Sequence, residues 1–187
     1  MGQKFSNLEE LTDGRPITIL AFKEERILEV WKKNESGWRA VCSYPFTGFS
    51  GELGPKLIEG DGQIPEGVYE VEYLNPNSSF HLSIKIDYPN GFDRKMAARD
   101  GRKQLGDDIF IHGSTVTIGC IPIGDDKMEE LFYLIAKNGY QNTKVIIAPC
   151  DFRRGKSHPV IDAVDWESNL YQLIEESLQK YPISQSH

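Results

Sequence analysis

The sequence predicts an α+β fold that is mainly β with two or more helices. Short runs rich in β-branched and aromatic residues recur along the chain and are separated by Gly, Pro, Asn and Asp, a pattern typical of strands and turns. In two later segments the apolar spacing changes to the three and four of a helix face. A length of 187 residues fits one domain. We therefore expect a single domain over 1–187, with a β-rich core at about 17–150 and a helical extension at about 160–181.

The first strands are expected to form a hairpin. Ile17–Phe22 and Arg26–Trp31 alternate apolar and polar residues, and a charged turn, Lys23–Glu25, joins them. The Gly- and Pro-bearing region Thr47–Pro65 is interpreted as a loop over the sheet. The remaining strand candidates are Trp38–Tyr44, Val68–Leu74, Phe80–Ile86, Asp108–His112 and Lys144–Ala148.

Helices are expected in two places. One begins near Asp125, where Asp126 and Glu129 have the spacing of a capping box. Its apolar face would contain Met128, Leu131, Phe132 and Ile135. The other ends before Pro182 and would present Trp166, Leu170, Leu173 and Ile174.

The charge balance is acidic, with 28 Asp and Glu against 21 Lys and Arg, a net charge of -7 and a pI near 5.2. Such a surface disfavours nucleic acid and anionic membranes. No apolar run approaches the roughly 20 residues that a transmembrane helix needs. Met1–Glu10 also lacks the basic and then apolar pattern of a signal peptide. We predict no nucleic-acid partner and no transmembrane segment, and expect a cytoplasmic chain, another export route or a missing leader.

Three cysteines, Cys42, Cys120 and Cys150, are too few and too scattered for a disulfide framework or a zinc site. The histidines do not stand at metal-ligand spacing, so no metal and no cofactor are predicted. Cys42 and Cys150 lie in apolar runs and are interpreted as inert packing thiols.

Cys120 follows His112 by eight residues, between an expected strand and an expected helix. A nucleophilic thiol needs a base or a stabilising field, and His112 could be that base if the carbonyl of Gly113 held its other nitrogen. The amides of Gly119 and Cys120 could form an oxyanion hole, because glycine allows a tight turn. Taken alone, this pattern is more typical of a packed strand end than of an active site.

Longer motifs change that interpretation. Ile111-His112-Gly113 followed by Ile118-Gly119-Cys120-Ile121 resembles the active-site motif of the L,D-transpeptidase catalytic domain family. Gly54–Lys56, Glu59–Gly62 and Ile64–Tyr69 resemble its glycine-rich approach and Thr-Pro-x-Gly turn, with Ile64 at the Thr position. Leu74–Arg94 is similar to a murein subgroup that includes amidases releasing lipoprotein from peptidoglycan.

The resemblance implies a β-sandwich-like domain and an acyl transfer on peptidoglycan stem peptides. Cys120 would form a thioester acyl-enzyme, with His112 as base and then acid, and water or an amine would resolve it. The implied location is periplasmic or extracytoplasmic, with the export signal absent from this sequence, and wall-bound lipoprotein is a possible partner. Two alternatives remain open: an inactive wall-binding module that keeps the groove, and a cytoplasmic cysteine hydrolase acting on another peptide.

The chain departs from the family pattern beside the thiol. Many members have Ser/Thr-His-Gly-Cys followed by Arg, whereas Thr117–Pro122 has neither that histidine nor the arginine. Another cation should then bind the substrate carboxylate. The substrate-binding candidates are Arg94, Arg102, Lys56 and Tyr88, with Arg99 and Lys103 as further cations, although solvation or packing explains each of them more simply. The basic run Arg153–Lys156 is interpreted as a solvated loop.

Overall fold

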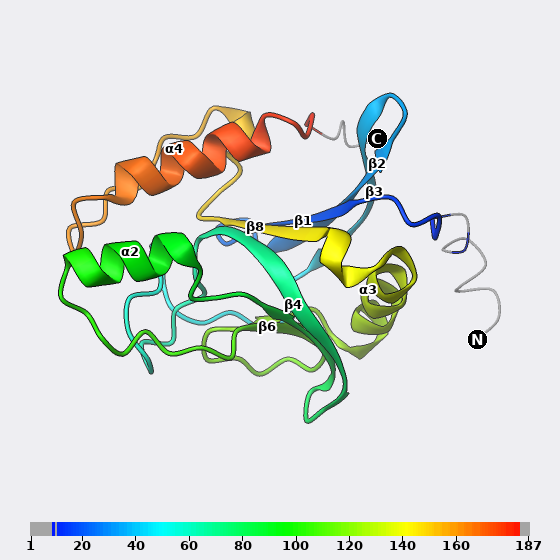
Figure 1. Cartoon of the computed structure of the whole chain (residues 1–187), viewed down its shortest axis with the longest axis horizontal. Coiled ribbons are helices and arrows are strands. Elements are labelled where there is room, and N and C mark those ends of the chain that lie inside the picture. The colour runs from blue at the N-terminus through cyan, green and yellow to red at the C-terminus, as the bar shows by residue number, and fades with distance from the viewer. Residues whose placement is uncertain (1–8, 10, 184–187) are drawn as a thin grey trace.

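The computed structural model describes residues 9 and 11–183, so most of the segment tested for a leader lies outside the described part of the chain. Eight strands and three α-helices are present in that part (Figure 1). The strands are β1 Ile17–Phe22, β2 Ile27–Asn34, β3 Gly37–Pro45, β4 Gly67–Ser78, β5 His81–Ile86, β6 Phe110–His112, β7 Ile121–Pro122 and β8 Thr143–Ala148. The helices are α2 Gly91–Arg99, α3 Asp125–Asn138 and α4 Glu167–Leu178, with 3₁₀ turns η1 Tyr140–Asn142 and η2 Phe152–Arg154.

The strands follow one another in the order β3-β2-β1-β8-β4-β5-β6-β7. β1 pairs parallel with β8 and β6 parallel with β7, whereas the other pairings are antiparallel. The long strand β4 joins two halves of the sheet, because its start, Gly67–Glu70, pairs with β8 and its continuation pairs with β5. The expected hairpin is present as β1 and β2.

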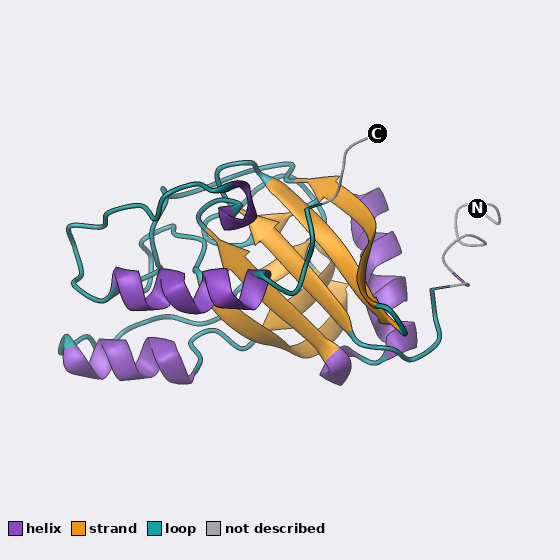
Figure 2. Ribbon diagram, turned by 90° about the horizontal axis from the view of Figure 1, so that it is seen from above, coloured by secondary structure: helices purple, strands orange, loops and turns teal. Residues whose placement is uncertain are grey.

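Two hydrophobic cores lie on opposite faces of the central strands. In β1, Ile19 belongs to the core that includes Leu131 of α3, and Leu20 belongs to the core that includes Leu170 of α4. Successive side chains of a strand point to opposite faces, so the fully buried β1 supplies both cores. Figure 2 shows α3 and α4 on opposite sides of the sheet. The first core also contains Ile84 and Ile111 from the other half of the sheet, which gives the fold its sandwich-like character.

Helix α2 was not predicted, because its segment is polar and only Asp93, Met96 and Ala97 are buried. Its start does carry a local signal. The Asn90 side chain accepts hydrogen bonds from the amides of Phe92 and Asp93, and the Asp93 carboxylate accepts one from the Asn90 amide. This capping box stands in the sequence as Asn-x-x-Asp.

The capping box predicted for α3 is wrong. The helix begins after Gly124, which provides no side-chain cap, and Glu129 instead binds His81 of β5, with 2.9 Å between Oε1 and Nε2. The Glu129 side chain, which the local sequence pattern assigned to the helix terminus, therefore makes a tertiary contact instead.

The interpretation of Arg153–Lys156 as a solvated loop is also wrong for Arg153. Its side chain is 6% exposed, and its guanidinium contacts Asp151 at 2.7 Å and Glu29 at 2.9 Å. Arg154, 50% exposed, fits the expectation. The ion pair between Arg153 and Glu29 could not be predicted from the sequence, because Glu29 lies on β2, far from Arg153 along the chain.

The region Thr47–Pro65 contains no helix or strand, and a buried ion pair anchors it to the rest of the fold. Lys23 Nζ lies 2.9 Å from Glu66 Oε1, with neither side chain exposed to solvent. Lys23 also donates to the carbonyls of Gly54 and Ile64, and the other carboxylate oxygen of Glu66 accepts from Tyr171 of α4. The pair therefore ties this loop to both β1 and α4. In the described part of the chain, no helix is long and apolar enough to span a membrane.

Candidate active site

The parallel pair β6 and β7 places the predicted cysteine beside the short strand that ends in the predicted histidine. Ile111 pairs with Ile121, so Cys120, just before β7, stands beside Phe110 of β6. The Phe110 amide donates to Cys120 Sγ at 3.4 Å, and the Sγ lies 3.6 Å from the carbonyl oxygen of Asp108. His112 ends the same strand two residues after Phe110, and alternate residues of a strand share a face.

His112 is buried, with 1% of its surface exposed. Its Nδ1 donates to the carbonyl oxygen of Gly113, the contact that the sequence suggested, and the ring lies 4.7 Å from that of Phe80, centroid to centroid. Burial lowers the pKa of His112, and the hydrogen bond to Gly113 opposes that shift only in part. The imidazole is therefore neutral near pH 7, with the lone pair on Nε2.

The thiol of Cys120 is protonated at rest. Burial raises its pKa, Asp108 adds to that shift, and the Phe110 amide and the charge of Lys56 oppose it. Burial also raises the pKa of Cys42 and of Cys150, each to about 11. Both shifts favour a neutral thiol and a neutral imidazole over a thiolate and imidazolium pair.

The turn before the thiol needs glycine. Gly119 has φ of +125°, and a Cβ there would lie 3.1 Å from the carbonyl oxygen of Gln63. The amide of Cys120 donates to Thr117 Oγ1 at 2.8 Å, and that hydroxyl donates to the Cys120 carbonyl at 2.7 Å. One of the two amides expected to form an oxyanion hole is therefore already bonded within the turn.

The loop between β6 and β7 is fixed at several points. The Ser114 amide donates to Asp125 Oδ1 of α3 at 2.7 Å, and Thr47 Oγ1 donates to the Ser114 carbonyl at 2.7 Å. Asp108 and Ser114, which flank β6, have φ of 54° and 65°. Such left-handed conformations are unfavourable outside glycine and cluster at functional sites.

Three predicted substrate-binding residues already have internal partners. Lys56 is 6% exposed, and its ammonium lies 2.6 Å from Asp61 Oδ1. Tyr88 is 2% exposed, and its hydroxyl donates to the Leu105 carbonyl at 3.2 Å, so it packs in the core rather than lining an open groove. Arg102 donates to Asp100 and to the Leu57 carbonyl. These contacts arise from loop geometry that sequence spacing does not specify.

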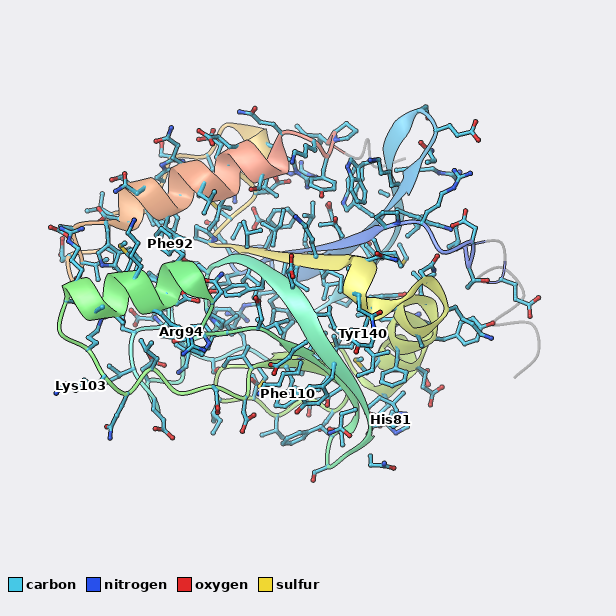
Figure 3. All side chains as sticks on the ribbon, in the orientation of Figure 1. His81, Phe92, Arg94, Lys103, Phe110 and Tyr140 are labelled. Carbon is cyan, nitrogen blue, oxygen red and sulfur yellow. The ribbon has the colours of Figure 1, made fainter. Side chains whose placement is uncertain are left out.

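The other cations lie away from the thiol. Figure 3 shows Arg94 on α2 and Lys103 on the segment that follows, both apart from Phe110, the residue beside Cys120. Arg99 pairs with Asp165 on the surface, 2.5 Å apart. A hollow is lined by Gln63, Ile58 and Arg102, and the carbonyl of Gln63 lies against Gly119 in the turn before the thiol.

Sequence reasoning missed Lys85 of β5. Strand register places it opposite Tyr73 on one side and Phe110 on the other, in the row that leads to Cys120. Only pairing across strands brings these residues together, although the alternation of Ser83, Ile84 and Lys85 indicates which of them share a face. Among the described residues, no group of three or more His, Cys, Asp or Glu side chains is arranged to hold a metal ion.

The fold and the motif order define a class of protein. Residues 16–147 match the L,D-transpeptidase catalytic domain family, YkuD, and the chain belongs to that family. Among curated proteins it is similar to the "Putative L,D-transpeptidase YafK" of Escherichia coli K12, with 36% identity over 124 residues. That match covers 65% of this chain and 48% of YafK, so the chain spans about half the length of this relative.

Solved structures agree on the fold. The helical cell shape determining protein Pgp2 of Campylobacter jejuni superposes with a TM-score of 0.60 at 21% identity, over 95% of this chain and 63% of Pgp2. Bd1075 of Bdellovibrio bacteriovorus gives a TM-score of 0.52 at 20% identity, over 88% of this chain and 55% of Bd1075. At these identities the likeness concerns the fold alone.

Proposed function

We propose that this chain is a cysteine enzyme that acts on peptidoglycan stem peptides through a thioester acyl-enzyme. The observation that carries the proposal is the β6 and β7 register, which sets Cys120 beside Phe110 on the strand that ends in His112. Family membership supports the substrate class. Since peptidoglycan crosslinks lie outside the cytoplasmic membrane, the proposed reaction takes place there.

In the proposed acylation, Cys120 Sγ attacks the amide carbonyl carbon while its proton passes to His112 Nε2. The tetrahedral intermediate then collapses, the C–N bond breaks, and Nε2 gives the proton to the leaving amine. The neutral state of both groups fits this order, because the base must accept a proton that the thiol still holds. In deacylation, water or an amine attacks the thioester, its proton goes to Nε2, and Sγ regains a proton as it leaves.

Oxyanion stabilisation is proposed for the amides of Gly119 and Cys120. Within the described residues, the Gly119 amide donates to no protein acceptor, so it is available to a developing oxyanion. The Cys120 amide contributes only if the Thr117 hydroxyl rotates away from it. One such donor is typically worth about 10²–10³ in rate.

Hydrolysis and transpeptidation share the acyl-enzyme and differ in the acceptor. The resemblance of Leu74–Arg94 to lipoprotein-releasing amidases favours water as the acceptor and wall-bound lipoprotein as a donor. Incubation with lipoprotein-bearing sacculi and with free tetrapeptide muropeptides, followed by mass spectrometry, separates the two. We expect release without dimers, whereas dimers would indicate transpeptidation.

The matched variants are Cys120→Ala and Cys150→Ala, because both remove a thiol but only Cys120 lies beside β6, the strand that ends in the predicted base. Activity should be lost in Cys120→Ala and retained in Cys150→Ala. Equal products from the natural protein and Cys120→Ala would overturn the enzyme proposal and leave a wall-binding module.

A further inference from the structure

Lys85 occupies a row of residues that crosses the sheet toward the thiol. Tyr73 of β4 pairs with Lys85 of β5, Lys85 pairs with Phe110 of β6, and the Phe110 amide contacts Cys120 Sγ. Neighbouring strands lie ~4.8 Å apart, so the backbones of Lys85 and Cys120 are separated by roughly 10 Å. A substrate residue next to the attacked carbonyl can span that distance.

The row lies on the face opposite the hydrophobic core. Ile84 and Ile111, which alternate with the row, are at most 1% exposed and belong to the core. Tyr73 is 39% exposed, and Phe110 is half-buried.

The ammonium of Lys85 lies over the ring of Tyr73, which in turn packs against Phe110. Its Nζ lies 5.8 Å from the Tyr73 ring centroid, and the Tyr73 and Phe110 rings meet edge to face with their centroids 6.4 Å apart. The Lys85 side chain is only 13% exposed. Burial is the largest single influence and disfavours its charge, but the hydrogen bond to Asp108 together with the negative charges of Asp108 and Glu72 outweighs burial and raises the pKa of Lys85, so the group is cationic at neutral pH.

The anionic partners of Lys85 are exposed and replaceable. Asp108 Oδ1 lies 3.2 Å from Nζ with its side chain 69% exposed, and Glu72 Oε2 lies 3.6 Å away with its side chain 51% exposed. Ion pairs with exposed carboxylates are weak, because water screens the attraction. Lys56, by contrast, is held by Asp61, whose side chain is only 16% exposed. A ligand carboxylate can therefore displace Asp108 from Lys85 more easily than it can displace Asp61 from Lys56.

We propose that Lys85 is a specificity-determining residue that binds a carboxylate of the stem peptide beside the attacked amide. The inference rests on the proposed function for its substrate class. It supplies the cation that the sequence lacks after Cys120, from a neighbouring strand instead of from the nucleophile motif. Tyr73 and Phe110 flank the bound carboxylate and exclude water from its contact with the ammonium.

The test measures binding in the Cys120→Ala background, so that it does not depend on turnover. The probes are a free tetrapeptide stem and the same peptide with its carboxylates converted to primary amides. Lys85→Met keeps the apolar stem and removes the charge, and Lys85→Arg keeps the charge. Lys144→Met is the matched control, because Lys144 is an exposed strand lysine of β8 outside the row.

We expect Lys85→Met to weaken binding of the carboxylate peptide by about ten- to hundredfold, the range of a hydrogen bond to a charged group. Binding of the amidated peptide should not change, Lys85→Arg should restore most of the affinity, and Lys144→Met should have no effect. The inference is overturned if Lys85→Met binds the carboxylate peptide as tightly as the Cys120→Ala protein that retains Lys85. It is also overturned if that protein binds neither peptide measurably, or if Lys85→Met weakens the binding of both peptides equally. If Lys85→Met loses only the binding of the carboxylate peptide, and the protein that retains Cys120 shows no turnover, the inference is supported and the proposed enzyme activity is overturned.

Discussion

His112 donates its Nδ1 hydrogen to the carbonyl oxygen of Gly113, the residue that follows it in the chain. A carbonyl oxygen can only accept, so this bond fixes the tautomer and leaves Nε2 as the basic nitrogen. The orientation of the ring therefore depends on the backbone, and no carboxylate is needed to hold it.

The first prediction concerns the acid limb of the pH profile. Because burial lowers the pKa of His112, the base stays deprotonated below the ordinary value near 6.5. The value of kcat/KM for stem-peptide cleavage should therefore fall only as the pH drops below about 6.5. A profile that already declines between pH 8 and 7 would contradict a neutral, buried His112 as the base.

The second prediction concerns the reactivity of Cys120 in the free protein. Its pKa is raised, so the rate of alkylation by iodoacetamide should keep rising beyond pH 9 and show no plateau near neutrality. A variant with Cys42→Ala and Cys150→Ala isolates the signal. A plateau below pH 8 would mean a resting thiolate, which the surroundings of Sγ do not favour. Slow alkylation near neutrality is therefore consistent with an enzyme as well as with a binding module, and turnover must decide between them.

The third prediction compares two adjacent arginines. Arg153→Met leaves the carboxylates of Asp151 and Glu29 buried with one cation fewer, and should lower the free energy of unfolding by about 3 kcal/mol or more. Arg154→Met removes an exposed partner of Asp151 and should cost less than about 1 kcal/mol. Urea unfolding of both variants provides the comparison, and similar losses would show that burial does not separate the two arginines.

The fourth prediction concerns Asp93 at the start of α2. Burial raises its pKa to about 6, so the folded state binds a proton more tightly than the unfolded state, whose pKa is near 3.8. Stability from this group should therefore increase as the pH falls from about 7 to 4. Asp93→Asn removes that contribution, and the difference in free energy of unfolding between the two proteins should shift in favour of the natural one on acidification. A difference independent of pH would be evidence against a buried, titrating Asp93.

The strands could be predicted because their alternation is local, and each expected strand is present with small shifts at its ends. The parallel pairings could not, since nothing in Ile17–Phe22 or Thr143–Ala148 specifies the other as its partner. The polar helix α2 escaped detection because its apolar face is too narrow to produce a clear periodicity.

At the candidate site, the motif identified Cys120, His112 and Gly113, and the Gly113 contact followed from the needs of an imidazole base. Their catalytic roles remain predictions. The cation was sought in the sequence just before the site strand, whereas Lys85 is brought there by the register of β5 against β6. The occupied amide of Cys120 depends on the rotamer of Thr117, which sequence does not determine.

The parallel pairing of β1 with β8 also bears on the order in which the protein can assemble. Ile17 pairs with Thr143 at the centre of the sheet, so β1 can form hydrogen bonds along both of its edges only after β8, the last strand of the described residues, has been added. Closing so long a stretch of chain costs entropy that only late contacts repay, which slows folding. A ribosome would have released nearly all of the family-matched segment before the sheet could close. Until then β4, which joins the site strands to the rest, has no partner on its β8 side.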